Sequence, residues 1–221
     1  MHGLGDTAAG WIDAAQFWQR TMPDTRFVLP TAPSIPVTLN GGYVMPAWYD
    51  LQGLSERDDE TCNGIEMSRD AILDLIESET VLLKDVKKKV GKGEDRIVPL
   101  VLAGFSQGAA LSLFTGLQQP RTSLAGIVCM SGYLPKPDKV CAVQKKGISR
   151  APVFMAHGNA DMTVKLSWAT SAKKKIDACC ETASSMKIYD GLAHSVDVEE
   201  LNDVCDFMKR VLGDAPVKKD E

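Results

Sequence analysis

Hydrophobic and polar positions along the 221-residue chain form two kinds of segment that alternate. One kind is short and apolar, as in a strand buried within a sheet, and the other is longer with a helical repeat of apolar residues. The strand-like segments lie near residues 26–29, 96–103, 124–130, 153–156 and 186–189. The helix-like segments lie near residues 11–21, 64–89, 107–118, 166–180 and 196–212. This alternation predicts an α/β fold with a mostly parallel central sheet and helices on both faces.

Two stretches show neither repeat. Residues 30–60 and 132–150 are rich in proline, glycine and polar residues, so we interpret them as the long connections on which a substrate site is built. No segment repeats within the chain. We expect residues 1–212 to form a single domain and residues 213–221 to be a mobile polar tail.

A glycine-flanked serine follows the second strand-like segment. Residues 104–108 read Gly-Phe-Ser-Gln-Gly, between an apolar run and the start of a helix pattern. Glycines two positions before and after Ser106 remove side chains that would clash where a strand turns sharply into a helix. The pattern is typical of the nucleophile elbow of an α/β-hydrolase, and the alternative is an ordinary glycine-rich helix start.

Such a nucleophile needs a histidine later in the chain. Of the 3 histidines, His194 fits best, because it follows the strand-like segment 186–189 and a turn, and it precedes the last helix pattern. It would take the proton from Ser106 and return it to the leaving group. The alternative is a histidine that only precedes a helix.

The acid of the triad should follow another strand. Asp161 ends the turn after the strand-like segment 153–156, and it would fix the tautomer of the histidine. Asp177 and Asp190 compete with it, but the first lies inside a helix pattern and the second only four residues before His194. We interpret His157 as a hydrogen-bonding residue that shapes this turn.

Stabilisation of the developing oxyanion requires two backbone donors. The first is expected from the amide of Gln107, the residue after the nucleophile. The second is expected from the opening loop His-Gly-Leu-Gly-Asp at residues 2–6, where glycines on both sides of Leu4 leave its amide free to face the site.

Blocks of sequence along nearly the whole chain point to one family. They are residues 2–6 with Trp11, 30–33, 37–40, 45–50, 53–55, 104–109, 111–112, 131–135, 157–158 with Asp161, and 194–195. In these blocks the chain resembles the acyl-protein thioesterases of the phospholipase/carboxylesterase family. The resemblance implies a catalytic triad of Ser106, Asp161 and His194, with the amides of Leu4 and Gln107 as oxyanion donors.

The substrate that the resemblance implies is a fatty-acyl thioester on a protein cysteine, with related activity on lysophospholipids and small esters. From the residues alone we infer only an ester or thioester hydrolase. Apolar residues on the predicted connections would line an acyl groove, and each could equally be core; they are Trp48, Leu51, Leu54, Tyr133 and Leu134. A carboxylesterase or lysophospholipase acting on small or short-acyl esters is the alternative within the same chemistry.

The start of the chain departs from the family pattern. In the family an apolar strand leads into the loop at residues 2–6, whereas here only Met1 precedes it. We therefore expect the N-terminal strand to be missing, which would leave sheet edges near Phe27 and Leu100 unpaired, as in a truncated chain or an incomplete gene sequence. The alternatives are rearranged strand pairing, which would misplace Leu4, and a catalytically dead interaction protein.

Composition changes this picture little. The net charge of −4, with scattered basic residues, argues against a nucleic-acid partner, and the hydrophobic content of 44% is ordinary for a globular domain. The basic segment 84–94 is expected to be a solvated loop, with contact to an anionic membrane as the alternative. No stretch has the length of a membrane span, and we predict a cytoplasmic protein, with peripheral membrane contact left open.

The 6 cysteines show no spacing typical of metal ligands. In a cytoplasmic enzyme we expect them to be reduced, with Cys129 in the core and the pair Cys179 and Cys180 at the surface. No cofactor or metal is expected, and the sequence leaves the oligomeric state open.

Overall fold

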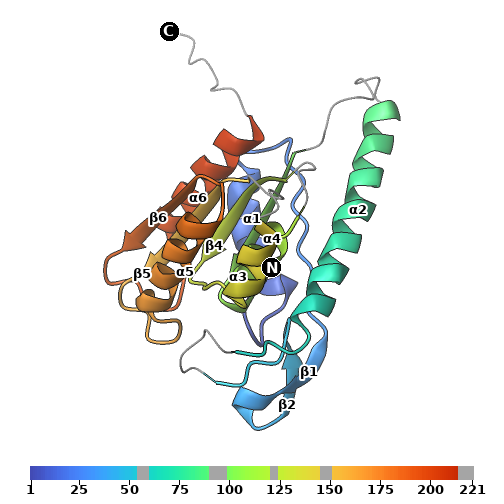
Figure 1. Cartoon of the computed structure of the whole chain (residues 1–221). Helices are drawn as coiled ribbons and strands as arrows, with labels where there is room; N and C mark the ends of the chain where they lie inside the picture. The colour runs from blue at the N-terminus through green and yellow to red at the C-terminus, as the bar shows by residue number, and fades with distance from the viewer. Residues whose placement is uncertain (54–59, 90–98, 120–123, 145–150, 214–221) are drawn as a thin grey trace.

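The computed structural model describes residues 1–53, 60–89, 99–119, 124–144 and 151–213. Its central sheet has four parallel strands in the order β3-β4-β5-β6 (Figure 1). The strands are β3 (Leu100–Phe105), β4 (Leu124–Met130), β5 (Val153–Gly158) and β6 (Ser184–Tyr189). Since parallel neighbours need crossover connections, the helices between these strands must lie against the faces of the sheet. Because the strands are parallel, their carboxyl ends meet at one edge of the sheet, where the loops of the site gather.

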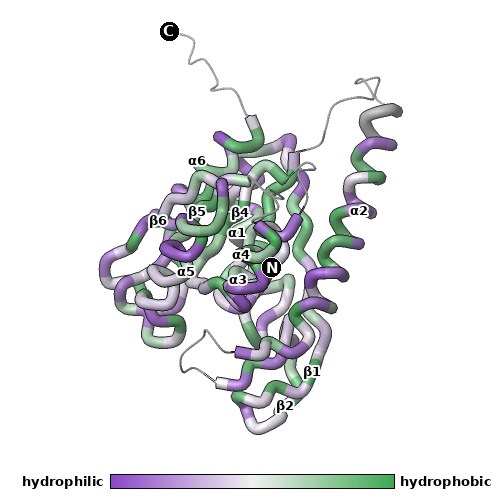
Figure 2. The backbone as a smooth tube through the Cα atoms, viewed as in Figure 1, coloured by the Kyte–Doolittle hydropathy of each residue, from purple (hydrophilic) through white to green (hydrophobic). Residues whose placement is uncertain are grey.

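Helices cover both faces, as predicted. One face carries α2 (Ile65–Lys89), α3 (Gln107–Gly116), α4 (Pro137–Gln144) and α5 (Leu166–Cys179), and the other carries α1 (Ile12–Gln19) and α6 (Val198–Leu212). The residues of β4 alternate between the two faces. Ile127 and Cys129 pack in the core beneath α2 to α5, whereas Val128 and Met130 pack in the core beneath α1 and α6. Figure 2 shows mainly hydrophobic positions around β4, while α2 alternates between hydrophobic and hydrophilic positions.

The two connections predicted as loops contain secondary structure. Residues 30–60 include the antiparallel hairpin of β1 (Ser34–Val37) and β2 (Tyr43–Pro46), with the short helix η2 (Thr38–Asn40) between them. Residues 132–150 include α4. A further short helix, η1 (Ala8–Trp11), precedes α1. Each of these elements spans at most eight residues, too short for its repeat to stand out in the sequence.

The strand expected near residues 26–29 does not form. The segment lies beside α2, where Arg26 donates to Glu79 at 2.6 Å between Nε and Oε2. Among the described residues no strand pairs with this segment, and an extended segment without a neighbour makes no ladder. The parallel order β3-β4-β5-β6 shows no rearrangement of the pairing that was expected for these strands.

The expectation that all cysteines are reduced is wrong for one pair. Cys141 of α4 and Cys179 of α5 form a disulfide with a Cα–Cα distance of 5.3 Å. The sequence gives no hint of it, because 38 positions separate the two residues and only the unpredicted helix α4 brings Cys141 to the end of α5. Cys129 is free and buried, as expected, and Cys180 is buried rather than at the surface.

Candidate active site

Ser106 stands at the turn between β3 and α3. Its φ of 55° and ψ of −119° are strained for a residue with a side chain, and its N–H donates to the carbonyl of Met130 at 2.9 Å. The flanking glycines are needed for space, since a Cβ on Gly104 would lie 2.2 Å from the carbonyl oxygen of Gly108. The strand and the helix therefore approach so closely that the hydroxyl is presented at the carboxyl end of the sheet.

The predicted histidine and acid lie in line with this serine. His194 Nε2 is 2.9 Å from Ser106 Oγ, and His194 Nδ1 is 2.7 Å from Asp161 Oδ2. The second carboxylate oxygen, Oδ1, accepts the backbone N–H groups of Thr163 and Val164, each at 2.8 Å. The Asp161 side chain is fully buried, whereas that of His194 is 20% exposed. This is the geometry in which an imidazole can remove a serine proton while a fixed carboxylate stabilises the resulting cation.

Two loops carry this acid and this base, and they are hydrogen-bonded to each other. Asn159 N–H donates to the carbonyl of Tyr189, and Ala160 N–H donates to the carbonyl of Leu192, both at 3.0 Å. The Asn159 side chain adds two bonds, to Asp190 Oδ1 at 2.7 Å and from Gly191 N–H at 2.8 Å. Asp190, a competitor for the acid, therefore ties the loops together, and Asp177 pairs with Lys173 on α5.

One predicted oxyanion donor, Gln107, is next to the serine in sequence, and the loop that carries the other, Leu4, packs against the serine through Gly3. Gln107 follows Ser106 at the start of α3, and Gly3 is so close that a Cβ on it would lie 3.3 Å from Ser106 Cβ. Within the described part of the chain, no acceptor takes the N–H of Leu4 or of Gln107. Both amides are thus free to bind an oxyanion, and their role as its donors stays a prediction.

His2 holds the opening loop in place, a role that the sequence reasoning missed. Its ring is buried, with Nδ1 2.7 Å from its neighbour Gly3's carbonyl oxygen and Nε2 2.9 Å from the N–H of Ala32. A carbonyl only accepts and an N–H only donates, so Nδ1 carries the proton. Burial lowers the pKa of His2, which favours this neutral form. The only signal in the sequence was membership of the block at residues 2–6.

The side chain of Gln107 connects the elbow to the segment after β2. Its Oε1 accepts the N–H of Trp48 at 2.9 Å, and its Nε2 donates to the carbonyl of Tyr49 at 2.8 Å. Trp48 in turn donates from its indole to the carbonyl of His2 at 2.9 Å. These bonds join the elbow, the opening loop and residues 48–49 into one buried network.

The residues predicted to line an acyl groove are placed differently from the expectation. Four of them are buried in the core, and Leu54 lies outside the described residues; the four are Trp48, Leu51, Tyr133 and Leu134. Tyr133 shares a 2.6 Å hydrogen bond with the hydroxyl of Tyr49. In this structure these side chains are core rather than the open wall of a groove, and contact with an acyl chain stays a prediction for them.

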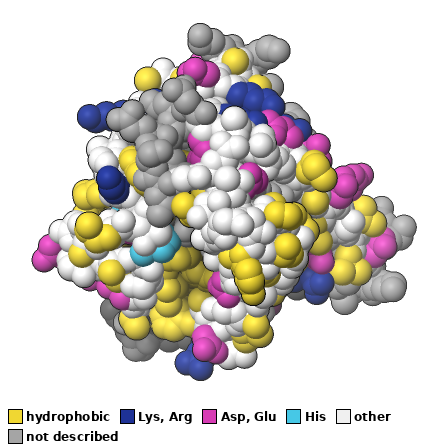
Figure 3. All heavy atoms as spheres, turned by 90° about the horizontal axis from the view of Figure 1, so that it is seen from below, with side chains coloured by type: hydrophobic (Ala, Val, Ile, Leu, Met, Phe, Trp, Pro, Cys, Tyr) yellow, Lys and Arg dark blue, Asp and Glu magenta, His cyan; other side chains and the backbone are white. Residues whose placement is uncertain are grey.

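The surface beside the site is apolar. Figure 3, which looks at the molecule from below, shows a histidine side chain at the surface next to hydrophobic side chains in a hollow. Of the three histidines, His194 has a side chain that is 20% exposed, and its ring packs against that of Phe105 with the centroids 4.9 Å apart. An acyl group bound at Ser106 would thus have hydrophobic surface available to it.

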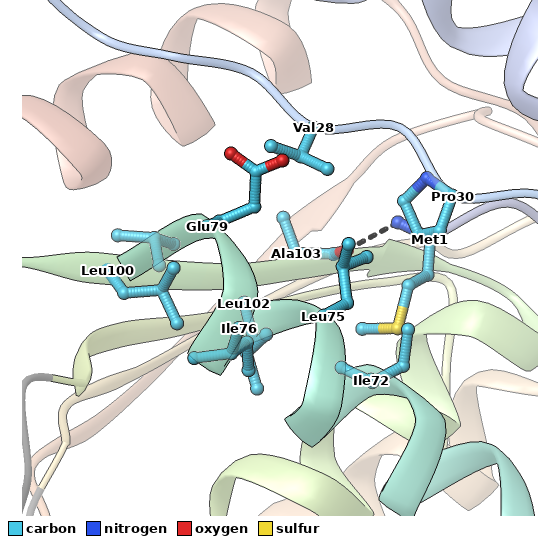
Figure 4. A pocket seen from close by; sticks show the side chains of 11 residues that line it. Met1, Val28, Pro30, Ile72, Leu75, Ile76, Glu79, Leu100, Leu102 and Ala103 are labelled. Carbon is cyan, nitrogen blue, oxygen red and sulfur yellow. Dashed lines mark hydrogen bonds between the residues drawn. The ribbon is translucent and has the colours of Figure 1, made fainter. Parts of the chain in front are cut away.

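An open edge of β3 lies behind the opening loop. Met1 donates from its amino group to the carbonyl of Ala103 at 2.7 Å and accepts the N–H of Phe105 at 3.1 Å, as a parallel strand residue would. Further along, β3 and the segment near Val28 are separated by a groove of about 100 Å³ (Figure 4). Its described lining is apolar apart from Glu79; it comprises Met1, Val28, Pro30, Ile72, Leu75, Ile76, Leu100, Val101, Leu102 and Ala103.

No described strand pairs with this edge of β3. The segment at residues 26–29 forms no strand and does not pair with β3, and Met1 alone among the described residues bridges to that edge. Yet the loop at residues 2–6 still reaches Ser106, because Met1 and His2 pack on α3: a Cβ on Gly108 would lie 2.4 Å from either carbonyl oxygen. Burial lowers the pKa of the Met1 amine to about 5.

The described residues lack two other kinds of feature. No group of histidine, cysteine or acidic side chains there could hold a metal ion. None of the described helices combines the length and apolarity that crossing a membrane requires.

Comparison with known proteins identifies the family. The model of the phospholipase/carboxylesterase family matches residues 1–212. The chain is 37% identical to acyl-protein thioesterase 1 of Saccharomyces cerevisiae, over 96% of this chain and 91% of that protein. It is 34% identical to acyl-protein thioesterase 1 homolog 1 of Dictyostelium discoideum, over 96% and 88% of the two chains.

Solved structures agree with this result. SOBER1 of Arabidopsis thaliana superimposes with a TM-score of 0.79 at 25% identity, covering 96% of each chain. Acyl-protein thioesterase 2 of Zea mays gives a TM-score of 0.73 at 26% identity, over 96% of this chain and 91% of that one. The chain therefore belongs to the phospholipase/carboxylesterase family, and it is a serine hydrolase with the α/β-hydrolase fold.

Proposed function

We propose that this enzyme hydrolyses fatty-acyl thioesters on protein cysteines. In this proposal Ser106 is the nucleophile, His194 is the general base, and Asp161 is the carboxylate that orients the imidazole. The observation that carries the proposal is the continuous line from Ser106 Oγ through the imidazole to the buried carboxylate, at 2.9 Å and 2.7 Å. The relatives in yeast and Dictyostelium are named acyl-protein thioesterases, which supports this substrate class.

The residues act in two half-reactions. His194 Nε2 takes the hydroxyl proton as Ser106 Oγ attacks the acyl carbonyl, and it returns that proton to the departing cysteine sulfur. In the second half, His194 deprotonates a water molecule that attacks the acyl-serine and regenerates the enzyme. The amides of Leu4 and Gln107 stabilise the negative oxygen in both steps.

Labelling with a fluorophosphonate probe tests the nucleophile. We expect the purified chain to be labelled and the Ser106→Ala variant to remain unlabelled, because only an activated serine reacts quickly. Ser112→Ala is the matched control, since this buried serine of α3 only donates to the carbonyl of Gly108 and should not affect labelling. A folded wild-type chain that is not labelled would favour the non-catalytic interaction protein.

Substrate preference is a separate measurement. Hydrolysis of a palmitoyl-cysteine peptide is compared with that of p-nitrophenyl acetate on unlabelled enzyme from one preparation, whose active fraction is measured by probe labelling of a separate aliquot. A kcat/KM that is at least about tenfold higher for the long-chain thioester supports the proposal, in line with the binding of several methylene groups at about 0.8 kcal/mol each. A preference for the short ester would favour the carboxylesterase alternative.

A further inference from the structure

A second buried histidine lies on the far side of the triad acid. His157 belongs to the end of β5, and its side chain is 1% exposed. Its Nε2 is 2.7 Å from the carbonyl oxygen of Val164 and 3.5 Å from Asp161 Oδ2. The same carboxylate oxygen is bonded to His194 at 2.7 Å. Two imidazoles therefore converge on one carboxylate.

The hydrogen bonds of His157 define its tautomer. A carbonyl oxygen only accepts, so Nε2 must carry the proton that Val164 receives. Its other ring nitrogen, Nδ1, is buried and has no partner in the described residues, which leaves it as an unprotonated lone pair. Burial also lowers the pKa of His157, which favours the neutral ring.

Val164 links this ring to the acid. Its N–H donates to Asp161 Oδ1 at 2.8 Å, while its carbonyl accepts from His157 at 2.7 Å. His157 thus holds the residue that holds the carboxylate. The same Nε2 lies 3.5 Å from Asp161 Oδ2, too far for a strong hydrogen bond but close enough for electrostatic attraction between the N–H and the carboxylate.

We propose that His157 is a positioning residue for the reaction: its neutral imidazole fixes Asp161 toward His194 through Val164. This inference rests on the proposed triad and goes beyond a role in shaping the turn. Neutrality matters here, because a charged His157 would compete with the His194 cation for the same carboxylate oxygen.

Two substitutions separate the hydrogen bond from the volume of the ring. In His157→Gln the side-chain amide can place a donor where Nε2 lies, whereas His157→Leu fills a similar volume and donates nothing. We expect kcat for thioester hydrolysis to fall about tenfold to a hundredfold in His157→Leu with little change in KM, and by less than about threefold in His157→Gln. Rates are normalised to the fluorophosphonate-labelled fraction.

Proton NMR gives a readout that a purely structural role would not change. The His194 proton shared with Asp161 should give a far-downfield resonance in the wild type and in His157→Gln, and should shift or broaden in folded His157→Leu. If both variants lose activity equally, or if the resonance is the same in all three folded proteins, the inference is wrong. A wild type without probe labelling would instead overturn the proposed triad, so the two failures are distinguishable.

Discussion

The two edges of β3 differ sharply. On one edge, all six residues of the strand pair with β4, and the N–H of Ser106 continues the contact to Met130. On the other edge, Met1 forms the single described bridge, and the rest of the strand faces the apolar groove. The carboxyl end of β3 is therefore held from both sides, and its amino end from one. The difference teaches that a site can be tightly fixed on a strand whose other half is open, because the supporting bonds gather at the end that carries the serine.

The largest expected loss of stability comes from adding a side chain at the carboxyl end of β3, the closed end, which is held from both sides. In Gly104→Ala the new Cβ would lie 2.2 Å from the carbonyl oxygen of Gly108, and backbone cannot yield there without moving α3. We expect a loss of about 4 kcal/mol or more in unfolding free energy, together with loss of probe labelling. Urea unfolding monitored by tryptophan fluorescence measures it.

Gly41→Ala is the matched control for this change. That glycine has a positive φ of 64°, which alone strains a side chain, but no atom lies within 4 Å of an added Cβ, so the cost should be only about 1 kcal/mol. Equal losses in the two variants would mean that the approach of β3 to α3 is not as tight as the structure has it.

The Met1 amine at the open edge of β3 should make the unfolding free energy depend on pH. Burial lowers the pKa of the Met1 amine to about 5 from its ordinary 8.0. Between these values the unfolded chain binds a proton that the folded chain does not, so stability rises from pH 5 to pH 8 by about 3 kcal/mol. Urea unfolding at several pH values measures this slope, and acetylation of the amino terminus should remove it. A slope unchanged by acetylation would show that the amine is exposed.

The buried carboxyl group of Glu200 should change stability with pH in the opposite direction from the Met1 amine. Glu200 of α6 is fully buried, and its carboxyl oxygens have no hydrogen-bond partner among the described residues. Burial raises its pKa to about 8, and the negative charges of Asp197 and Asp203 add to this effect. Here the folded chain binds the extra proton, so stability falls from about pH 4.5 to pH 8. Glu200→Gln should therefore raise the unfolding free energy by about 4–5 kcal/mol more at pH 9 than at pH 4. An equal change at both pH values would contradict the raised pKa.

The smallest expected effect comes from adding volume to the groove. Val28 is 39% exposed and lines the groove, so Val28→Phe should fill part of it and stabilise the fold by about 0.5–1 kcal/mol. The comparison is Ala109→Val at the closed end, where the side chain is fully buried and overpacking should cost about 1–3 kcal/mol. Thermal unfolding measures both variants. If both substitutions destabilise, the groove is not open to a larger side chain.

Much of the fold was predictable because its signals are local or strongly periodic. The apolar run at residues 124–130 gave the bounds of β4, and the long repeats gave α2, α5 and α6 to within two residues. The triad residues were recognised because each must follow a strand, and the structure places Ser106, Asp161 and His194 within hydrogen-bonding reach. Their catalytic roles stay predictions.

The features that were missed depend on contacts between distant segments. Residues 26–29 have the composition of a strand, but a strand needs a neighbour, and the segment has none among the described residues. The disulfide required α4, and the anchoring of the opening loop required His2 to meet Ala32 thirty positions away. The periodicity of hydrophobic residues does not predict such contacts between distant segments. The burial of Trp48 and Tyr133 was equally hidden, because aromatic residues in segments without a repeat suit a groove and a core alike.

The disulfide also changes the covalent connectivity of the enzyme. Cys141 and Cys179 close a ring of chain that contains β5 and Asp161, while Ser106 and His194 lie outside it. A protease that cuts the backbone once inside this ring leaves the two fragments joined, so the acid stays tethered to the nucleophile and the base. The cleaved enzyme would run as one band on a gel without reductant and as two bands with it.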